Sequence, residues 1–134
     1  MKVGALDETV RELDLRSLEK FVEDRQGAIT ALVVKPDAHG HVTKTFELAN
    51  LAQKHGLVTV ITNPFHSGFV SAVMANIAAC VNQDRDIPSE LTSGGWFRED
   101  LLIERLQVRH GQIDVEEAYV RSQHLRMEAL TQVE

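Results

Sequence analysis

One apolar run in the chain ends abruptly at a lysine and a proline: Ala28-Ile29-Thr30-Ala31-Leu32-Val33-Val34-Lys35-Pro36. It is nearly continuous and β-branched toward its end, which is typical of a strand covered on both faces in a parallel sheet. Pro36 stops such a strand because it has no backbone N–H to donate. We therefore expect a buried parallel strand that presents Lys35 at its end.

Similar but shorter patterns lie on both sides of this run. Apolar segments at residues 3–6 and 57–62 predict two further strands. Between them, Leu15, Leu18 and Val22 have helical spacing, with Asp14 as cap and Gly27 as stop, and residues 43–55 form a second helical pattern. A third helical stripe consists of Val70, Val73, Met74, Ile77, Ala78 and Val81. Strand and helix alternate three times, which predicts an α/β fold with parallel strands near residues 3–7, 28–35 and 57–62.

The rest of the chain breaks this alternation. Residues 84–95 read as a polar loop in which residues 90–92 form a brief fourth strand, and residues 96–102 read as a short helix. Residues 106–109 and 112–115 flank His110-Gly111 and predict a hairpin. Residues 116–130 predict a polar helix. We expect one partial domain, with a βα half-barrel over residues 1–103 and a hairpin and helix extension over residues 104–134.

Composition excludes several classes of function. The chain has 134 residues, 43% hydrophobic content and a net charge of -6, so we expect no nucleic-acid partner. No apolar run approaches the roughly 18 residues of a membrane span, so we expect no membrane partner. The single cysteine, Cys80, is expected to be buried in a reducing compartment. With no targeting segment ahead of Met1, we expect a cytoplasmic location, or the plastid stroma if the chain is part of a larger eukaryotic polypeptide.

Polar residues gather where the expected strands end. Asp7 and Glu8 follow the first strand, Lys35 follows the second, and Asn63 and His66 follow the third. In a parallel sheet these ends open on one edge. Carboxylates together with a lysine suit a divalent metal and proton chemistry at carbon.

Three motifs in this order resemble the fifth to seventh strands of the enolase superfamily barrel, and most closely the o-succinylbenzoate synthases of menaquinone and phylloquinone synthesis. They are Ala5-Leu6-Asp7-Glu8-Thr9, Val33-Val34-Lys35-Pro36 with the Gly40 turn, and Val60-Ile61-Thr62-Asn63-Pro64-Phe65-His66-Ser67-Gly68. Residues 96–102 and 106–115 resemble the closing segment of that family. The resemblance covers residues 3–115 and implies the second half of a (β/α)8 barrel.

The resemblance implies a Mg²⁺-dependent dehydratase that acts through an enediolate. Asp7 would be one of three metal-binding carboxylates, Glu8 a neighbour that orients it, and Lys35 the catalytic lysine across the substrate. The substrate would be a small carboxylate, contacted by Gly40, Asn63, His66, Ser67 and Gly68. The other ligands and the proton-abstracting lysine lie on earlier strands, so we expect a missing N-terminal half or second chain as partner, and no activity without it.

Two residues depart from the family pattern. His41 stands where a second glycine is expected and can crowd a substrate carboxylate, and His66 replaces a glutamate. Ser67-Gly68 can offer helix N–H groups to a carboxylate, or Ser67 can simply cap the helix. We expect His39-x-His41 to be a surface loop rather than a metal site, and His55, His110 and His124 to be solvated.

Three other functions compete with this one. A racemase, epimerase or cycloisomerase of the same superfamily would share Asp7 and Lys35, and a non-catalytic half-barrel remnant would share only the fold. A signalling receiver domain also has acidic residues after its first strand and a Lys-Pro after a later one. It fails because it needs an aspartate at a central strand end before the lysine, whereas residues 28–34 run directly into Lys35.

Overall fold

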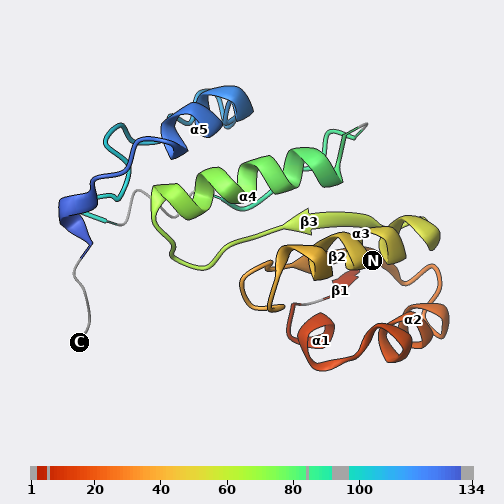
Figure 1. Cartoon of the computed structure of the whole chain (residues 1–134). Helices are drawn as coiled ribbons and strands as arrows, with labels where there is room; N and C mark the ends of the chain where they lie inside the picture. Colours follow the sequence, from red (N-terminus) through yellow and green to blue (C-terminus); the bar gives the residue numbers. More distant parts are fainter. Residues whose placement is uncertain (1–2, 6, 84, 92–96, 131–134) are drawn as a thin grey trace, which may run out of the picture. The chain divides into compact units, whose positions relative to one another are not determined.

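Three short strands form a parallel sheet in the order β1-β2-β3 in the computed structural model (Figure 1). The strands are β1 (Val3–Ala5), β2 (Ile29–Val34) and β3 (Val58–Ile61). Val3 lies opposite Ile29, and Val34 lies opposite Ile61. The predicted parallel strands and their alternation with helices are confirmed, so the chain is mixed α/β. A partial barrel stays a prediction.

The structure describes residues 3–5, 7–83, 85–91 and 97–130, with only the backbone at residues 3–5, 7 and 8. These residues fall into two compact units. The first unit comprises Met1–Thr62 and Val81–Glu90, and the second comprises Asn63–Cys80 and Leu91–Glu134. The expected single partial domain, divided at residue 103, stays a prediction.

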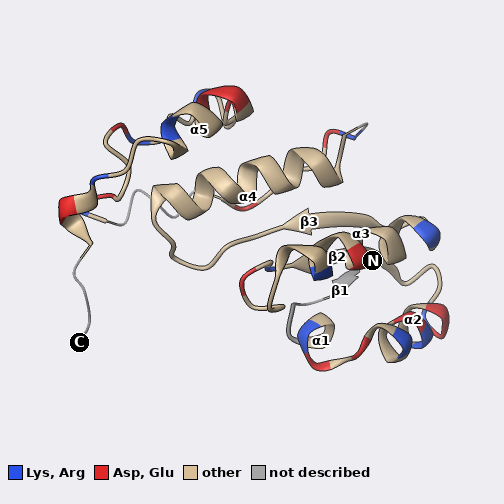
Figure 2. Ribbon diagram, in the orientation of Figure 1, with Lys and Arg blue, Asp and Glu red and all other residues tan. Residues whose placement is uncertain are grey.

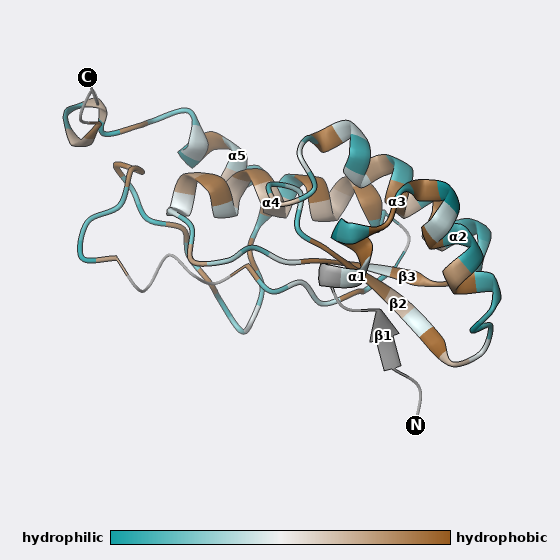
Figure 3. Ribbon diagram, turned by 90° about the horizontal axis from the view of Figure 1, so that it is seen from below, coloured by the Kyte–Doolittle hydropathy of each residue, from teal (hydrophilic) through white to brown (hydrophobic). Residues whose placement is uncertain are grey.

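Three helices accompany the sheet in the first unit: α1 (Asp7–Glu12), α2 (Leu15–Glu23) and α3 (Val42–Lys54). The Asp14 side chain accepts a hydrogen bond of 2.7 Å from the Ser17 N–H, so the predicted cap of α2 is confirmed. The short helix α1 was not predicted, because residues 7–12 carry no apolar stripe. In Figure 3, α2 and α3 carry hydrophilic and hydrophobic segments together, as amphipathic helices do.

The sheet of the first unit is fully covered on one face only. Leu32, Val34 and Ile61 are 0% exposed. They share the core with side chains from all three helices, namely Val10, Leu18, Val22, Leu48 and Ala52. The alternate residues Ala31, Val33, Val58 and Val60 are only partly buried. Within the first unit, burial therefore follows the period of two of a strand with one covered face. The prediction that residues 28–34 are covered on both faces stays a prediction, because the first unit alone does not test it.

In the second unit, α4 (Gly68–Val81) packs by its small side chains. Its buried residues are Gly68, Ser71, Ala72, Met74, Ala75, Ile77 and Ala78. Val73 is 36% exposed, so the predicted stripe was rotated from the true one. Cys80 is exposed, contrary to prediction, because two residues after Ala78 it points well away from the buried stripe. Figure 2 shows that α4 carries no charged residue.

The remainder of the second unit has little regular structure. Residues 97–102 contain no helix, so that prediction is wrong where it can be judged, while residues 92–96 lie outside the described residues. The predicted hairpin reduces to one antiparallel bridge between Arg109 and Gln112, and Glu90 forms a single parallel bridge with Thr62 in the first unit. The predicted helix over residues 116–130 is instead α5 (Val115–Ser122) and a 3₁₀ turn (Met127–Ala129).

A second pairing in this unit was not predicted. Leu102 and Leu125 form an antiparallel bridge, and the Arg126 N–H donates to the Leu101 carbonyl at 2.7 Å. The Arg121 guanidinium binds Glu117 at 2.5 Å and the Arg105 carbonyl. The Arg121–Arg105 contact joins α5 to a residue 16 positions earlier, while the bridge pairs the segment that follows α5 with Leu102. Within the described ranges, no helix has the length and apolar character needed to cross a membrane.

Candidate functional site

The loop from β2 to α3 holds the backbone of Lys35 at the carboxyl edge of the sheet. The Lys35 carbonyl accepts hydrogen bonds from the N–H groups of Ala38 and His39 at 3.0 and 3.1 Å. The Lys35 N–H lies 3.1 Å from Nδ1 of His39. Both backbone polar groups of Lys35 are therefore engaged by its own loop, and its side chain projects from a fixed point.

The Lys35 side chain is half-buried and has contacts of its own. It directly follows β2, and the alternation of that strand assigns it to the partly covered face, with Ala31 and Val33. A half-buried lysine at a strand end is uncommon, since most lysines are exposed. Its position at the strand end is as predicted, while its catalytic role stays a prediction.

The two histidines of this loop serve the backbone. Nδ1 of His39 faces the backbone of Lys35, and Nδ1 of His41 accepts a hydrogen bond of 3.1 Å from the Lys44 N–H as the cap of α3. Gly40 between them has φ +100°, a conformation that favours glycine, and a Cβ there would meet nothing within 4 Å. Gly40 is thus required for its conformation rather than for space, and the expected surface loop is what forms.

Asp7 and Glu8 open α1, just beyond the end of β1. Because β1 and β2 are parallel neighbours, Asp7 and Lys35 both follow strands that end at one edge of the first unit. The side chains of Asp7 and Glu8 lie outside what the structure describes. Their expected roles in metal binding therefore stay predictions.

The remaining expected substrate residues belong to the second unit. Asn63 is 7% exposed and donates from Nδ2 to Oγ of Ser71 at 3.0 Å, while its Oδ1 is buried with no hydrogen-bond partner in the described structure. His66 and Ser67 are half-buried. Asn63 therefore braces α4 and retains one unused acceptor.

A carboxylate of the chain itself occupies the N-terminus of α4. The Gly68 N–H lies 2.9 and 3.0 Å from the two carboxylate oxygens of Asp100, and Asp100 is only 5% exposed. The Leu102 N–H donates to the same carboxylate at 3.2 Å. The sequence indicated a carboxylate at this helix end but not that Asp100 supplies one, so an external carboxylate at Gly68 would have to replace it.

A second cluster of functional side chains lies at the opposite, amino edge of the same sheet, and sequence reasoning missed it. Glu19 and Glu23 on α2 approach His55, which follows α3. The His55 side chain is 14% exposed and its Nε2 is 3.2 Å from Oε1 of Glu19, so the expectation that it is solvated is wrong. The two glutamates one helical turn apart were the available signal.

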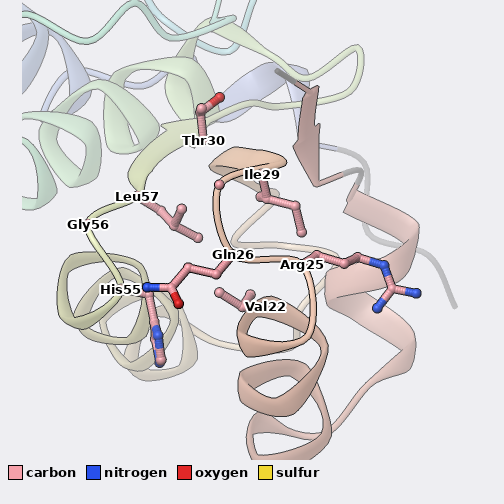
Figure 4. Close-up of a pocket in the computed structure, with 9 residues that line it drawn as sticks. Val22, Arg25, Gln26, Ile29, Thr30, His55, Gly56 and Leu57 are labelled. Carbon is pink, nitrogen blue, oxygen red and sulfur yellow. The ribbon is translucent and has the colours of Figure 1, made fainter. Parts of the chain in front are cut away.

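A small pocket adjoins this cluster (Figure 4). Its volume is about 180 Å³. It is lined by Val22, Arg25, Gln26, Gly27, Ile29, Thr30, His55, Gly56 and Leu57. Figure 4 shows the Gln26 side chain reaching toward His55 and the Arg25 guanidinium directed away, and that group stacks on Phe21 at 3.8 Å.

Comparison with known proteins gives one informative similarity. The chain is 31% identical, over 120 aligned residues, to a protein from Arabidopsis thaliana named Protein PHYLLO, chloroplastic. The match covers 78% of this chain but 7% of that protein, so the chain spans a small part of its relative's length. No family model matches the chain. The comparisons therefore establish a distant relationship to one part of a much longer protein.

Proposed function

We propose that this chain is the C-terminal portion of an o-succinylbenzoate synthase-like dehydratase of menaquinone or phylloquinone synthesis. In this proposal it acts through an enediolate, requires Mg²⁺, and is inactive until the missing half of the barrel is supplied. One observation carries the proposal: the parallel order β1-β2-β3, with Lys35 fixed directly after the central strand. The similarity to PHYLLO supports it.

The metal site cannot be completed by this chain's described residues. Mg²⁺ prefers several oxygen ligands in near-octahedral geometry. The proposal assigns it Asp7, with Glu8 adjacent, while the group of three metal-capable side chains found together in the described residues lies at the other edge of the sheet. The remaining ligands must come from the missing half, and in the complete site Mg²⁺ would supply Lewis acidity beside a carboxylate.

Lys35 has the simplest role in this proposal. Its ammonium would lie across the substrate from the missing base and stabilise the negative charge that develops when a proton leaves carbon. The fixed backbone of Lys35 suits such a role, because an electrostatic contribution depends on a preorganised group. Gly40, Asn63, His66, Ser67 and Gly68 would line the site for a small carboxylate substrate.

The decisive experiment supplies the missing half in trans. The N-terminal half of an o-succinylbenzoate synthase is mixed with this chain, and dehydration and Mg²⁺ binding are measured with and without it. We expect the chain alone to bind Mg²⁺ weakly and to turn over nothing measurable, and the mixture to recover both. Substantial turnover by the chain alone would refute the half-barrel proposal.

Lys35 is tested in the complemented enzyme. Lys35→Ala should lower turnover by about 10²-fold or more, the usual size of a lost acid–base or electrostatic contribution, with an unchanged melting temperature. Lys35→Arg should rescue little, because arginine is larger and does not give up a proton. Asp7→Asn should be partly rescued by high Mg²⁺. Parallel losses of stability and activity in Lys35→Ala would make the lysine structural.

Two alternatives remain within reach of the same experiment. A racemase, epimerase or cycloisomerase would turn over its own substrate without loss of water, which product analysis detects. A non-catalytic half-barrel remnant would stay inactive after complementation. For location we propose the cytoplasm, or the plastid stroma if the chain belongs to a longer polypeptide, as the chloroplastic label of PHYLLO favours.

A further inference from the structure

The cluster at the amino edge of the sheet has the composition of a transition-metal site. Glu19 and Glu23 lie one helical turn apart on α2, and His55 follows the last residue of α3. One potential ligand atom from each of the three lies within 4.8 Å of the others. Two carboxylates and an imidazole form a ligand set that suits zinc better than magnesium, which seldom takes nitrogen ligands.

The spacing of the Glu19 and His55 side chains fits a shared metal. Oε1 of Glu19 and Nε2 of His55 are 3.2 Å apart. Two ligands at about 2.0–2.1 Å from a tetrahedral zinc are separated by roughly 3.3 Å. The His55 and Glu19 side chains are 14% and 32% exposed, so protein walls part of the site. A carboxylate oxygen of Glu23, within 4.8 Å of both atoms, would supply the third ligand and leave a fourth position open.

The charges around the cluster favour a cation. Two glutamates at i and i+4 repel each other on a helix surface. The Lys54 ammonium partly offsets this repulsion, because its Nζ lies 2.5 Å from Oε1 of Glu19. The Lys54 side chain is 66% exposed and can swing into solvent.

We propose that Glu19, Glu23 and His55 bind Zn²⁺ or a similar divalent transition metal, and that Lys54 competes with the metal for Glu19. His55 also lines the pocket of about 180 Å³, so a water or small molecule bound there would lie beside the site as a fourth ligand. The site is independent of the proposed dehydratase function, since it lies at the sheet edge opposite Lys35 and uses none of its residues.

The test is direct metal binding to the full, tag-free chain. Co²⁺ is titrated and followed by its visible absorption, then displaced by Zn²⁺, and Zn²⁺ and Mg²⁺ are compared by calorimetry. We expect one Zn²⁺ per chain and much weaker Mg²⁺ binding at this site. Absence of saturable Zn²⁺ binding would overturn the proposal.

Variants locate the site and separate it from an ordinary ion pair. Glu23→Gln and His55→Ala should each weaken Zn²⁺ binding by about tenfold or more, given that loss of even an outer partner costs 10–100-fold. Lys54→Met should strengthen binding several-fold, because it removes the competitor. Weaker binding in Lys54→Met, or unchanged binding in Glu23→Gln, would show an ion-pair network only.

Two control substitutions test specificity. Glu12→Gln and His124→Ala change exposed residues of the same types elsewhere and should leave Zn²⁺ affinity unchanged. The His39-x-His41 loop is the rival histidine site. If His41→Ala abolishes binding while His55→Ala does not, the metal lies in that loop and the proposal is wrong. Glu23→Gln remains informative even if His55→Ala fails to fold.

Discussion

The N-termini of α3 and α4 are capped in contrasting ways. The exposed imidazole of His41 accepts one hydrogen bond from the N–H of Lys44, three residues along the chain. The buried carboxylate of Asp100 accepts from Gly68, 32 residues away, and also from Leu102. From the sequence, a substrate carboxylate was expected near His41, and at Ser67-Gly68 either a carboxylate or simple capping by Ser67 was left open. The difference indicates that a ligand can reach the N-terminus of α3 by displacing a weak local cap. The N-terminus of α4 is instead held by a buried contact that connects two segments of the second unit.

The largest effect expected from this comparison is that of Asp100→Ala. It leaves the Gly68 and Leu102 N–H groups buried without their acceptor, which should destabilise the second unit by about 2–4 kcal/mol. Urea unfolding followed by circular dichroism, with hydrogen exchange of the α4 amides, measures the loss. Glu99→Ala changes the exposed neighbouring acid and is the matched control. Equal, small effects of both substitutions would show that Asp100 does not stabilise the second unit.

A smaller loss is expected from Gly68→Ala. A Cβ at this position would lie 2.5 Å from Oδ2 of Asp100 and 3.0 Å from Cδ1 of Leu102. Overpacking of this kind costs about 1–3 kcal/mol. The same substitution should cost clearly less in an Asp100→Ala background, because most of the clash is then gone. Strictly additive unfolding free energies in the double variant would contradict this contact.

His41→Ala should be milder. It removes a single exposed cap, for which about 1 kcal/mol or less is expected, and His41→Asn should restore most of it because asparagine is a good N-cap. Thermal melting of the three proteins is sufficient to measure this. An effect as large as that of Asp100→Ala would abolish the distinction between the two helix ends.

The smallest effect concerns the charged but exposed cap of α2. The hydrogen bond from Ser17 lowers the pKa of Asp14 below its ordinary value of 3.8. Because the folded pKa is depressed, the stabilisation is present above about pH 3.8 and is lost as the pH falls through the folded value. Asp14→Asn should flatten this slight acid dependence in unfolding measured between pH 2 and 6. An unchanged slope in the variant would assign the dependence to other carboxylates.

The first unit was predictable because its determinants are local. The run ending in Lys35, the Asp14 cap and the spacing of Leu18 and Val22 each lie within one element, and periodicity reads them directly. The covered faces of β2 are the exception, because an apolar run alone does not distinguish a strand covered on both faces from one covered on a single face.

The second unit was poorly predicted because its contacts are long-range. The sequence of residues 97–102 does not indicate that Asp100 caps a helix beginning at Gly68. The Leu102–Leu125 bridge joins two segments that lack the alternating pattern of strands. For the candidate site, the sequence located Lys35 at a strand end. It could not show that the Asp100 carboxylate accepts the hydrogen bond from the Gly68 N–H, or that His55 is largely buried beside two glutamates.

The exposed position of Cys80 allows site-specific labelling of the chain through its thiol. It is the chain's single cysteine, and it lies in the last turn of α4, directly before the backbone passes at Val81 from the second unit into the first. A thiol-reactive dye or spin label will therefore modify one atom per molecule, at the junction between the units. Its signal can report changes in the surroundings of the last turn of α4.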